Sequence, residues 1–133
     1  MAGKESPLRE AILCEAAPKP IGPYSQALRC DGWIFVSGQV PIDARTGRLE
    51  SGPIAQQTEI VLGNMRSILE AAGSSLARVV RVTVFLRDLA DFEAMNAVYA
   101  KFFSAVPPPA RSTVQVARLP KDAAIEVDAI ARA

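Results

Sequence analysis

The sequence contains no histidine. This absence excludes the Ser-His-Asp and Cys-His catalytic systems, because both need an imidazole as the general base. It also excludes metal sites that depend on histidine ligands. Any chemistry must therefore run on carboxylates, arginine, lysine, tyrosine, hydroxyl groups, backbone amides and water.

Cysteine and net charge are also scarce. Cys14 and Cys30 fit no disulfide framework or metal-binding pattern, so we expect free, buried thiols and no bound metal. A formal net charge of +1 gives no electrostatic footprint for nucleic acid. No apolar run approaches the roughly 20 residues that cross a bilayer, and the first residues lack the apolar core of a secretory signal. These features predict a cytoplasmic protein that binds neither nucleic acid nor membranes.

The rest of the composition is that of an ordinary globular protein. Half of the 133 residues are hydrophobic and 22% are charged, which suits a packed core rather than disorder. We predict one domain over residues 1–133. Residues 1–9 are polar, and we expect them to be frayed.

Alternating and β-branched apolar residues predict strands, and apolar residues three and four positions apart predict helices. The expected strands span residues 10–14, 26–30, 32–38, 79–86, 111–117 and 124–131. The expected helices cover residues 54–72 and 91–104. Gly73 is expected to stop the first helix, and Asp88 or Asp91 to cap the second.

The main elements follow the order β-β-α-β-α-β-β. This order predicts the α+β class, with a mixed sheet and two helices on one face. The other face would still carry apolar side chains from the strand at 79–86. A second copy of the chain is the simplest cover for that face, so we expect a homo-oligomer.

The last two strands are joined by a short segment, which favours an antiparallel hairpin. In that hairpin Val114 would lie opposite Val127, because the apolar sets of both strands would share a face. The polar residues would then share the other face, namely Arg111, Thr113, Gln115, Glu126 and Asp128.

Two interpretations of this polar face remain open. It is a solvated surface with scattered ion pairs, which contribute about 0–1 kcal/mol each. Alternatively, Arg111 binds a carboxylate through two parallel hydrogen bonds and Glu126 acts as a general base. Two residues span roughly 6.7 Å along a strand, so a small ligand would fit between these two side chains.

Four ordered motifs resemble the RidA (YjgF-like) family, over about residues 16–131. They are IGPYSQA, FVSGQVP, DLADFEAMNAVYAKFF and PARSTVQVARLPKDAAIEVDAIA. The resemblance implies a chorismate-mutase-like fold (Bacillus type) and a homotrimer with sites at subunit interfaces. It also implies hydrolysis of 2-iminobutanoate or 2-iminopropanoate to a 2-oxo acid and ammonia, without a cofactor.

The resemblance assigns roles to single residues. It implies that Arg111 holds the substrate carboxylate and that Glu126 positions the attacking water. The implied substrate-binding residues are Tyr24, Ser37, Gly38, Asn96 and Thr113. Many family members carry cysteine where this chain has Thr113, so a thiol nucleophile is absent at that position.

The residues by themselves leave alternatives. Tyr24 also suits a packing anchor, Ser37 and Gly38 a strand end, and Asn96 a buried structural hydrogen bond. At the level of function, a non-catalytic binding or regulatory module for small 2-oxo acids needs Arg111 alone. RNA cleavage has little support, because the chain lacks both a basic stripe and histidine.

Overall fold

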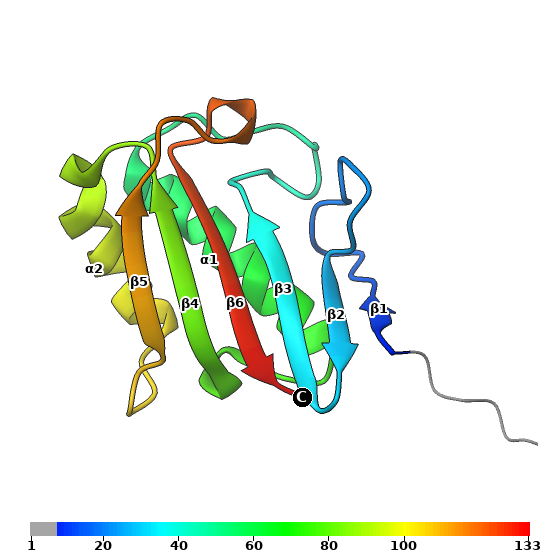
Figure 1. Cartoon of the computed structure of the whole chain (residues 1–133). Coiled ribbons are helices and arrows are strands. Elements are labelled where there is room, and N and C mark those ends of the chain that lie inside the picture. The colour runs from blue at the N-terminus through cyan, green and yellow to red at the C-terminus, as the bar shows by residue number, and fades with distance from the viewer. Residues whose placement is uncertain (1–7) are drawn as a thin grey trace, which may run out of the picture.

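The computed structural model describes residues 8–133, so most of the segment predicted to be frayed lies outside the described residues. A mixed sheet packs against two α-helices (Figure 1). Its strands are β1 (Glu10–Ile12), β2 (Ala27–Cys30), β3 (Trp33–Gln39), β4 (Val79–Leu86), β5 (Ala110–Gln115) and β6 (Ile125–Arg132). The helices are α1 (Ile54–Ala71) and α2 (Phe92–Phe102).

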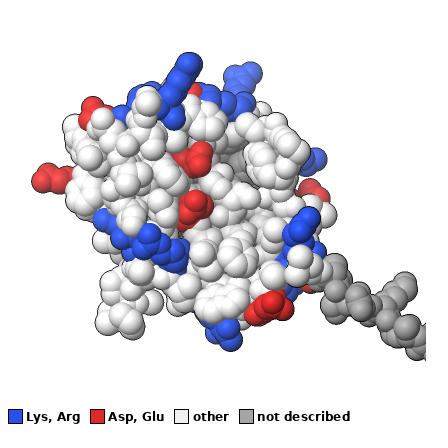
Figure 2. All heavy atoms as spheres, viewed as in Figure 1, with Lys and Arg blue, Asp and Glu red and all other residues white. Residues whose placement is uncertain are grey.

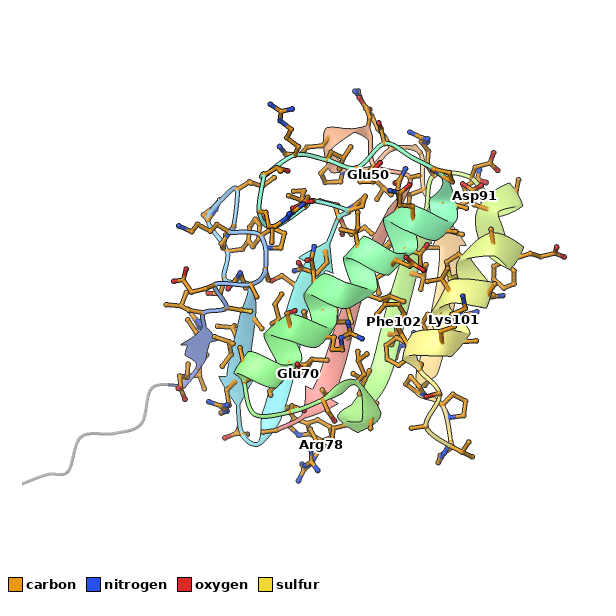
Figure 3. All side chains as sticks on the ribbon, turned by 180° about the vertical axis from the view of Figure 1, so that it is seen from behind. Glu50, Glu70, Arg78, Asp91, Lys101 and Phe102 are labelled. Carbon is orange, nitrogen blue, oxygen red and sulfur yellow. The ribbon has the colours of Figure 1, made fainter. Side chains whose placement is uncertain are left out.

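Both helices lie on the same face of the sheet, behind it in Figure 1 and in front of it in Figure 3. The predicted α+β class is therefore confirmed, with β1 as a third strand before α1. The predicted bounds agree with the observed ones to within two residues. As expected, Gly73 follows the end of α1, with a φ of 80° that suits glycine.

The predicted hairpin between the last two strands is wrong. The strand order is β1-β2-β3-β6-β4-β5, so β4 lies between β5 and β6. β5 pairs with β4 in parallel, because α2 provides the crossover that a parallel pair requires. Residues 116–124 then lead past β4, and β6 pairs antiparallel with both β4 and β3. Alternate side chains of β6 are buried, which suits an interior strand.

The hydrophobic core lies between the sheet and the helices. Val82, Val84 and Leu86 of β4 are fully buried there against apolar side chains of α1 such as Met65 and Ile68. Cys14 is also buried in this core, while Cys30 is only partly buried, and both thiols are free.

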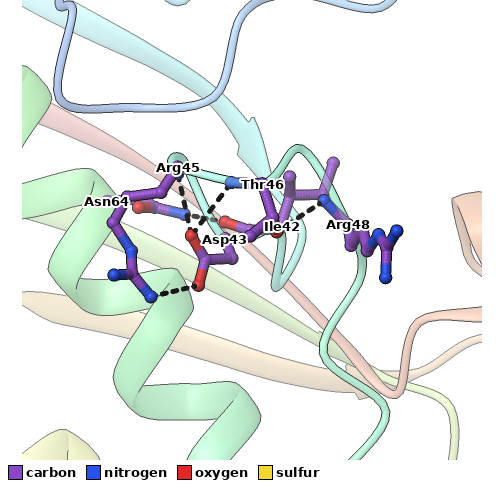
Figure 4. A network of polar contacts seen from close by, with 6 residues as sticks. All are labelled: Ile42, Asp43, Arg45, Thr46, Arg48 and Asn64. Carbon is purple, nitrogen blue, oxygen red and sulfur yellow. Dashed lines mark hydrogen bonds and ion pairs between the residues drawn. The ribbon is translucent and has the colours of Figure 1, made fainter.

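The loop between β3 and α1 is fixed by hydrogen bonds (Figure 4). The Asp43 carboxylate accepts from the backbone N–H groups of Arg45 and Thr46, at 2.8 and 3.3 Å. The buried Asn64 amide of α1 donates to the carbonyl of Ile42 at 2.8 Å. These bonds hold the chain that leaves β3 against α1 and so fix the end of that strand.

In the described part of the chain, no helix covers the other face of the sheet (Figure 1). Large apolar side chains remain accessible on it, with Phe35 43% and Val114 41% exposed. Figure 2 shows this face as mostly uncharged, with acidic side chains over β6, where Glu126 and Asp128 lie half-buried. We refer to it below as the open face.

Candidate active site

Arg111 lies on the helix side of the sheet. Its register partner on β4 is Val82, which is fully buried, and paired residues on neighbouring strands share a face. The guanidinium lies over the rings of Tyr99 and Phe92 in α2, 4.6 and 5.7 Å from their centres. Such cation–π contacts are attractive, so α2 positions the Arg111 side chain.

Unpartnered polar atoms accompany this cation. Within residues 8–133, the side-chain atoms that are buried without a hydrogen-bond partner are Asn96 Oδ1, Tyr99 OH and Thr113 Oγ1. Asn96 shares a helix face with Phe92 and Tyr99, four and three positions away. Thr113 follows Arg111 by two positions and shares its face. Buried polar groups normally have partners, so these atoms indicate a place for a polar ligand.

The backbone of β5 adds donors at the same place. β5 forms the edge of the sheet, and the N–H of Val116 donates to Leu86 O at 2.9 Å. The N–H groups of a strand alternate in direction, so those of Arg111 and Thr113 point toward the open edge. The Thr113 amide is thus directed away from β4 and past the edge of the sheet.

Glu126 lies on the open face and contacts Gly38 from β3. It pairs with Phe85, on the side of β4 that faces away from the helices. A Cβ atom added at Gly38 would lie only 2.8 Å from Glu126 Cδ, so the carboxylate occupies the space that a side chain would need. The pairing of β3 with β6 shifts register here, between Val36 and Gln39.

A pocket of 260 Å³ opens beside this carboxylate. Its walls are Ile21, Tyr24, Ser37, Gly38, Val40, Pro120 and Glu126. Burial raises the pKa of Glu126, and the nearby charge of Asp128 raises it further. A carboxylate whose pKa is raised in this way suits a general base that takes a proton from water.

Arg111 and Glu126 do not share a face, contrary to the expected polar face. Val84 pairs with both Thr113 and Val127, so Val127 shares a face with Thr113 rather than with Val114. The two strands are separated by β4, and three residues of register separate Arg111 from Glu126. Their Cα atoms are therefore about 14 Å apart, from roughly 3.3 Å per residue and 4.8 Å per strand.

Comparison with models of protein families assigns the chain to one family. The family described as Endoribonuclease L-PSP matches residues 14–133. The chain belongs to this family, the RidA (YjgF-like) family.

A RutC family protein of Pyrococcus horikoshii is 53% identical over 93% of this RidA-family chain and 98% of its own length. A protein of Dermatophagoides farinae named 2-iminobutanoate/2-iminopropanoate deaminase is 44% identical, over 92% and 94%. The crystal structure of the YjgF gene product of E. coli has a TM-score of 0.87 at 44% identity, covering 92% of this chain and 98% of that one. The chorismate-mutase-like fold is thereby confirmed.

Tyr24, Ser37 and Gly38, three of the other predicted site residues of this RidA-family chain, lie on the Glu126 side. The Tyr24 hydroxyl accepts from the N–H of Ile21 at 3.2 Å and borders the pocket. The Ser37 hydroxyl donates to the carbonyl of Ser25 at 2.6 Å, so it also fixes the chain locally. Asn96 and Thr113 instead accompany Arg111. The predicted residues thus form two groups, one on each side of the sheet.

Sequence reasoning missed Phe92 and Tyr99 as neighbours of Arg111. Both belong to the apolar stripe of α2, and in the sequence they look the same as the residues of that stripe that only pack in the core. The available signal was Asn96, a polar residue at helical spacing from both aromatic residues. Within residues 8–133, no cluster of three potential metal ligands occurs, and no helix is long and apolar enough to cross a membrane.

Proposed function

We propose that the chain hydrolyses reactive 2-imino acids, such as 2-iminobutanoate and 2-iminopropanoate, to 2-oxo acids and ammonia. The observation that carries this proposal is the Arg111 guanidinium beside unpartnered hydroxyl donors and the unpartnered Asn96 amide oxygen. A 2-imino acid offers the complementary groups, a carboxylate that accepts and a protonated imine that donates. The name of the Dermatophagoides relative supports the same substrate class.

The residues suit a reaction without a covalent enzyme intermediate. Arg111 binds the carboxylate bidentately, and the outward N–H of Thr113 donates to the ligand. Glu126 takes a proton from water as the water oxygen bonds to C2, and the C=N electron pair moves to nitrogen. Glu126 then returns the proton to the amine nitrogen. As the C–N bond breaks and ammonia leaves, the hydroxyl oxygen on C2 gives its proton to Glu126 and the C2 carbonyl forms, and Glu126 afterwards releases that proton to the solvent.

We further propose that two copies of the chain complete each site. Arg111 and Glu126 are too far apart within one chain to act on one small ligand, and they face opposite sides of the sheet. The open face with Phe35 and Val114 offers an apolar surface for a second copy. In the homotrimer that the resemblance implies, Arg111 of one copy would meet Glu126 of the next.

Two inactive variants test this proposal together. Arg111→Ala and Glu126→Gln should each lower kcat/KM for freshly generated 2-iminobutanoate at least about a hundredfold. Co-expression of both variants, which gives a random population of trimers, should recover about a quarter of the wild-type activity. The reason is that half of the sites keep Arg111 and half of those also keep Glu126.

The mixing experiment discriminates between the possible arrangements. If Arg111 and Glu126 acted within one copy, the mixed protein would remain as inactive as the separate variants. Full activity of Arg111→Ala alone would refute its role in holding the carboxylate. Native mass spectrometry of the same samples gives the oligomeric state.

A second function is favoured by one observation. Within one chain Arg111 and Glu126 lie on opposite faces of the sheet, so the Arg111 group by itself suits a binding module for small 2-oxo acids. Binding of 2-oxobutanoate without imine hydrolysis above the spontaneous rate would favour this function. RNA cleavage is not favoured, because net charge is +1 and acidic side chains occupy the middle of the open face (Figure 2).

A further inference from the structure

Tyr99 is held firmly, but its hydroxyl has no partner. The residue is only 8% exposed, and its ring stacks on Phe103 with 4.5 Å between centres. The Arg111 guanidinium also lies over this ring. Within residues 8–133 the hydroxyl has no partner in hydrogen-bond geometry, and the Arg111 guanidinium is the side chain near enough to lower its pKa. A buried tyrosine hydroxyl usually has a partner. A fixed, unpartnered hydroxyl beside a cation points to a ligand.

Thr113 presents a second hydroxyl of the same kind. Its register partner is the fully buried Val84, and its own Oγ1 is buried without a partner. Valine has nearly the same shape and would fill this strand position without leaving an unsatisfied polar atom. The threonine hydroxyl therefore lowers stability unless a ligand uses it.

Both hydroxyls and the guanidinium are donors that suit one anion. Burial raises the pKa of Tyr99, and the charge of Arg111 and the approach of its guanidinium to the hydroxyl offset this only in part, so the hydroxyl remains protonated at neutral pH. In the described part of the chain, Arg111 has no carboxylate partner. A water molecule would satisfy the hydroxyls but leave this charge uncompensated, whereas a carboxylate would do both.

We propose that the hydroxyls of Tyr99 and Thr113 bind the ligand carboxylate together with Arg111. Tyr99 then has two roles, because its ring holds the guanidinium while its hydroxyl donates to the same carboxylate. This inference rests on the proposed function only for the identity of the ligand. The arrangement itself requires a small carboxylate and no particular imine.

Variants that lack one hydroxyl test the inference, because their ligand affinity should fall while the stability of the free protein should not. Tyr99→Phe and Thr113→Val should each raise the Kd for 2-oxobutanoate about tenfold or more, measured by calorimetry. The urea midpoint of the free protein should stay the same or rise, because an unsatisfied hydroxyl is lost. Thr113→Ser keeps the hydroxyl and should restore binding close to the wild-type level.

Thr58→Val is the matched control. The Thr58 hydroxyl is buried in α1 and donates to the carbonyl of Ile54 at 2.7 Å. Its removal should lower the urea midpoint and leave the Kd unchanged, which is the behaviour of a hydroxyl with a structural role only. If Tyr99→Phe and Thr113→Val behaved like this control, the inference would be overturned.

The same measurements separate this inference from the proposed function. If the chain binds 2-oxobutanoate with the predicted dependence on both hydroxyls but hydrolyses no imine, the inference stands and the proposed function fails. If imine hydrolysis is present and neither hydroxyl affects KM or the Kd, the inference fails and the proposed function stands. Absence of 2-oxobutanoate binding by the wild-type chain would also overturn the inference.

Discussion

At the scale of single residues, Gly38 and Glu126 constrain each other. The carboxylate lies where a Gly38 side chain would be, so any larger residue must displace it. Glycine is therefore needed here for close approach rather than for an unusual backbone conformation. Its position at the register shift between β3 and β6 gives the acid room beside the pocket.

Gly38→Ala should impair activity by moving Glu126. The added Cβ would lie within 2.8 Å of Glu126 Cδ, so we expect kcat to fall at least about tenfold. Gly63→Ala in α1 is the matched control, because an added Cβ there meets nothing within 4 Å. The control should raise the free energy of unfolding by about 0.5–1 kcal/mol and leave kcat unchanged. An equal kcat in both variants would contradict the proposed contact.

The pKa of Glu126 predicts the acid limb of the pH–rate profile. Glu126 must be ionised to act as a base, so activity should fall as the pH drops through a pKa above the usual glutamate value. Asp128→Asn removes a repelling charge and should move this limb to lower pH. If the acid limb does not move in Asp128→Asn, the titration that causes it belongs to a group other than Glu126.

The raised pKa of Glu126 also lowers the stability of the fold at neutral pH. The folded state binds the Glu126 proton more tightly than the unfolded chain, so ionisation of Glu126 destabilises the fold at neutral pH. This cost is relieved as the pH falls through the folded pKa toward the unfolded one. Glu126→Gln should therefore stabilise the fold at pH 7, with a gain that shrinks on acidification, as urea unfolding at several pH values would show.

At the scale of elements, α2 depends on a cap that comes before it. The Asp88 carboxylate accepts from the N–H of Ala90 at 2.9 Å, in the short turn η2 (Leu89–Asp91) that leads into α2. Asp91, the other candidate from the sequence, makes no side-chain cap. The start of α2, and with it the Phe92 ring below Arg111, is thus fixed by Asp88.

Asp88→Ala should lower the free energy of unfolding by about 1 kcal/mol, because one N–H loses its partner. Asp91→Ala should change it by less than about 0.5 kcal/mol. Denaturant unfolding of both variants provides the measurement. Equal losses would show that the observed hydrogen bond contributes little.

At the scale of the whole molecule, the open face is the proposed interface between copies of the chain. Phe35 lies exposed on this face, away from the core. Phe35→Glu should leave the fold intact but place a charge in the proposed interface, so we expect smaller assemblies and loss of imine hydrolysis. Light scattering and circular dichroism of the variant would check both. An unchanged assembly would place the interface elsewhere.

The sequence by itself determined the elements and most of the candidate residues. Hydrophobic period and turn residues act over a few positions, so the helices, the strands and the stop at Gly73 were predictable. Arg111, Asn96 and Glu126 were found from their chemistry and their motifs. The absence of histidine already restricted the chemistry to carboxylates, hydroxyls, arginine and water.

Only the tertiary structure decided which strands pair and which side chains meet. The local pattern of the last two strands was equally compatible with a hairpin, but the crossover through α2 places β5 on one side of β4, and residues 116–124 lead the chain to β6 on the other side. With β4 between β5 and β6, Arg111 and Glu126 lie on opposite faces of the sheet, and Tyr99 lies beside Arg111. Such long-range placement depends on packing between distant segments, which periodicity along the chain does not encode.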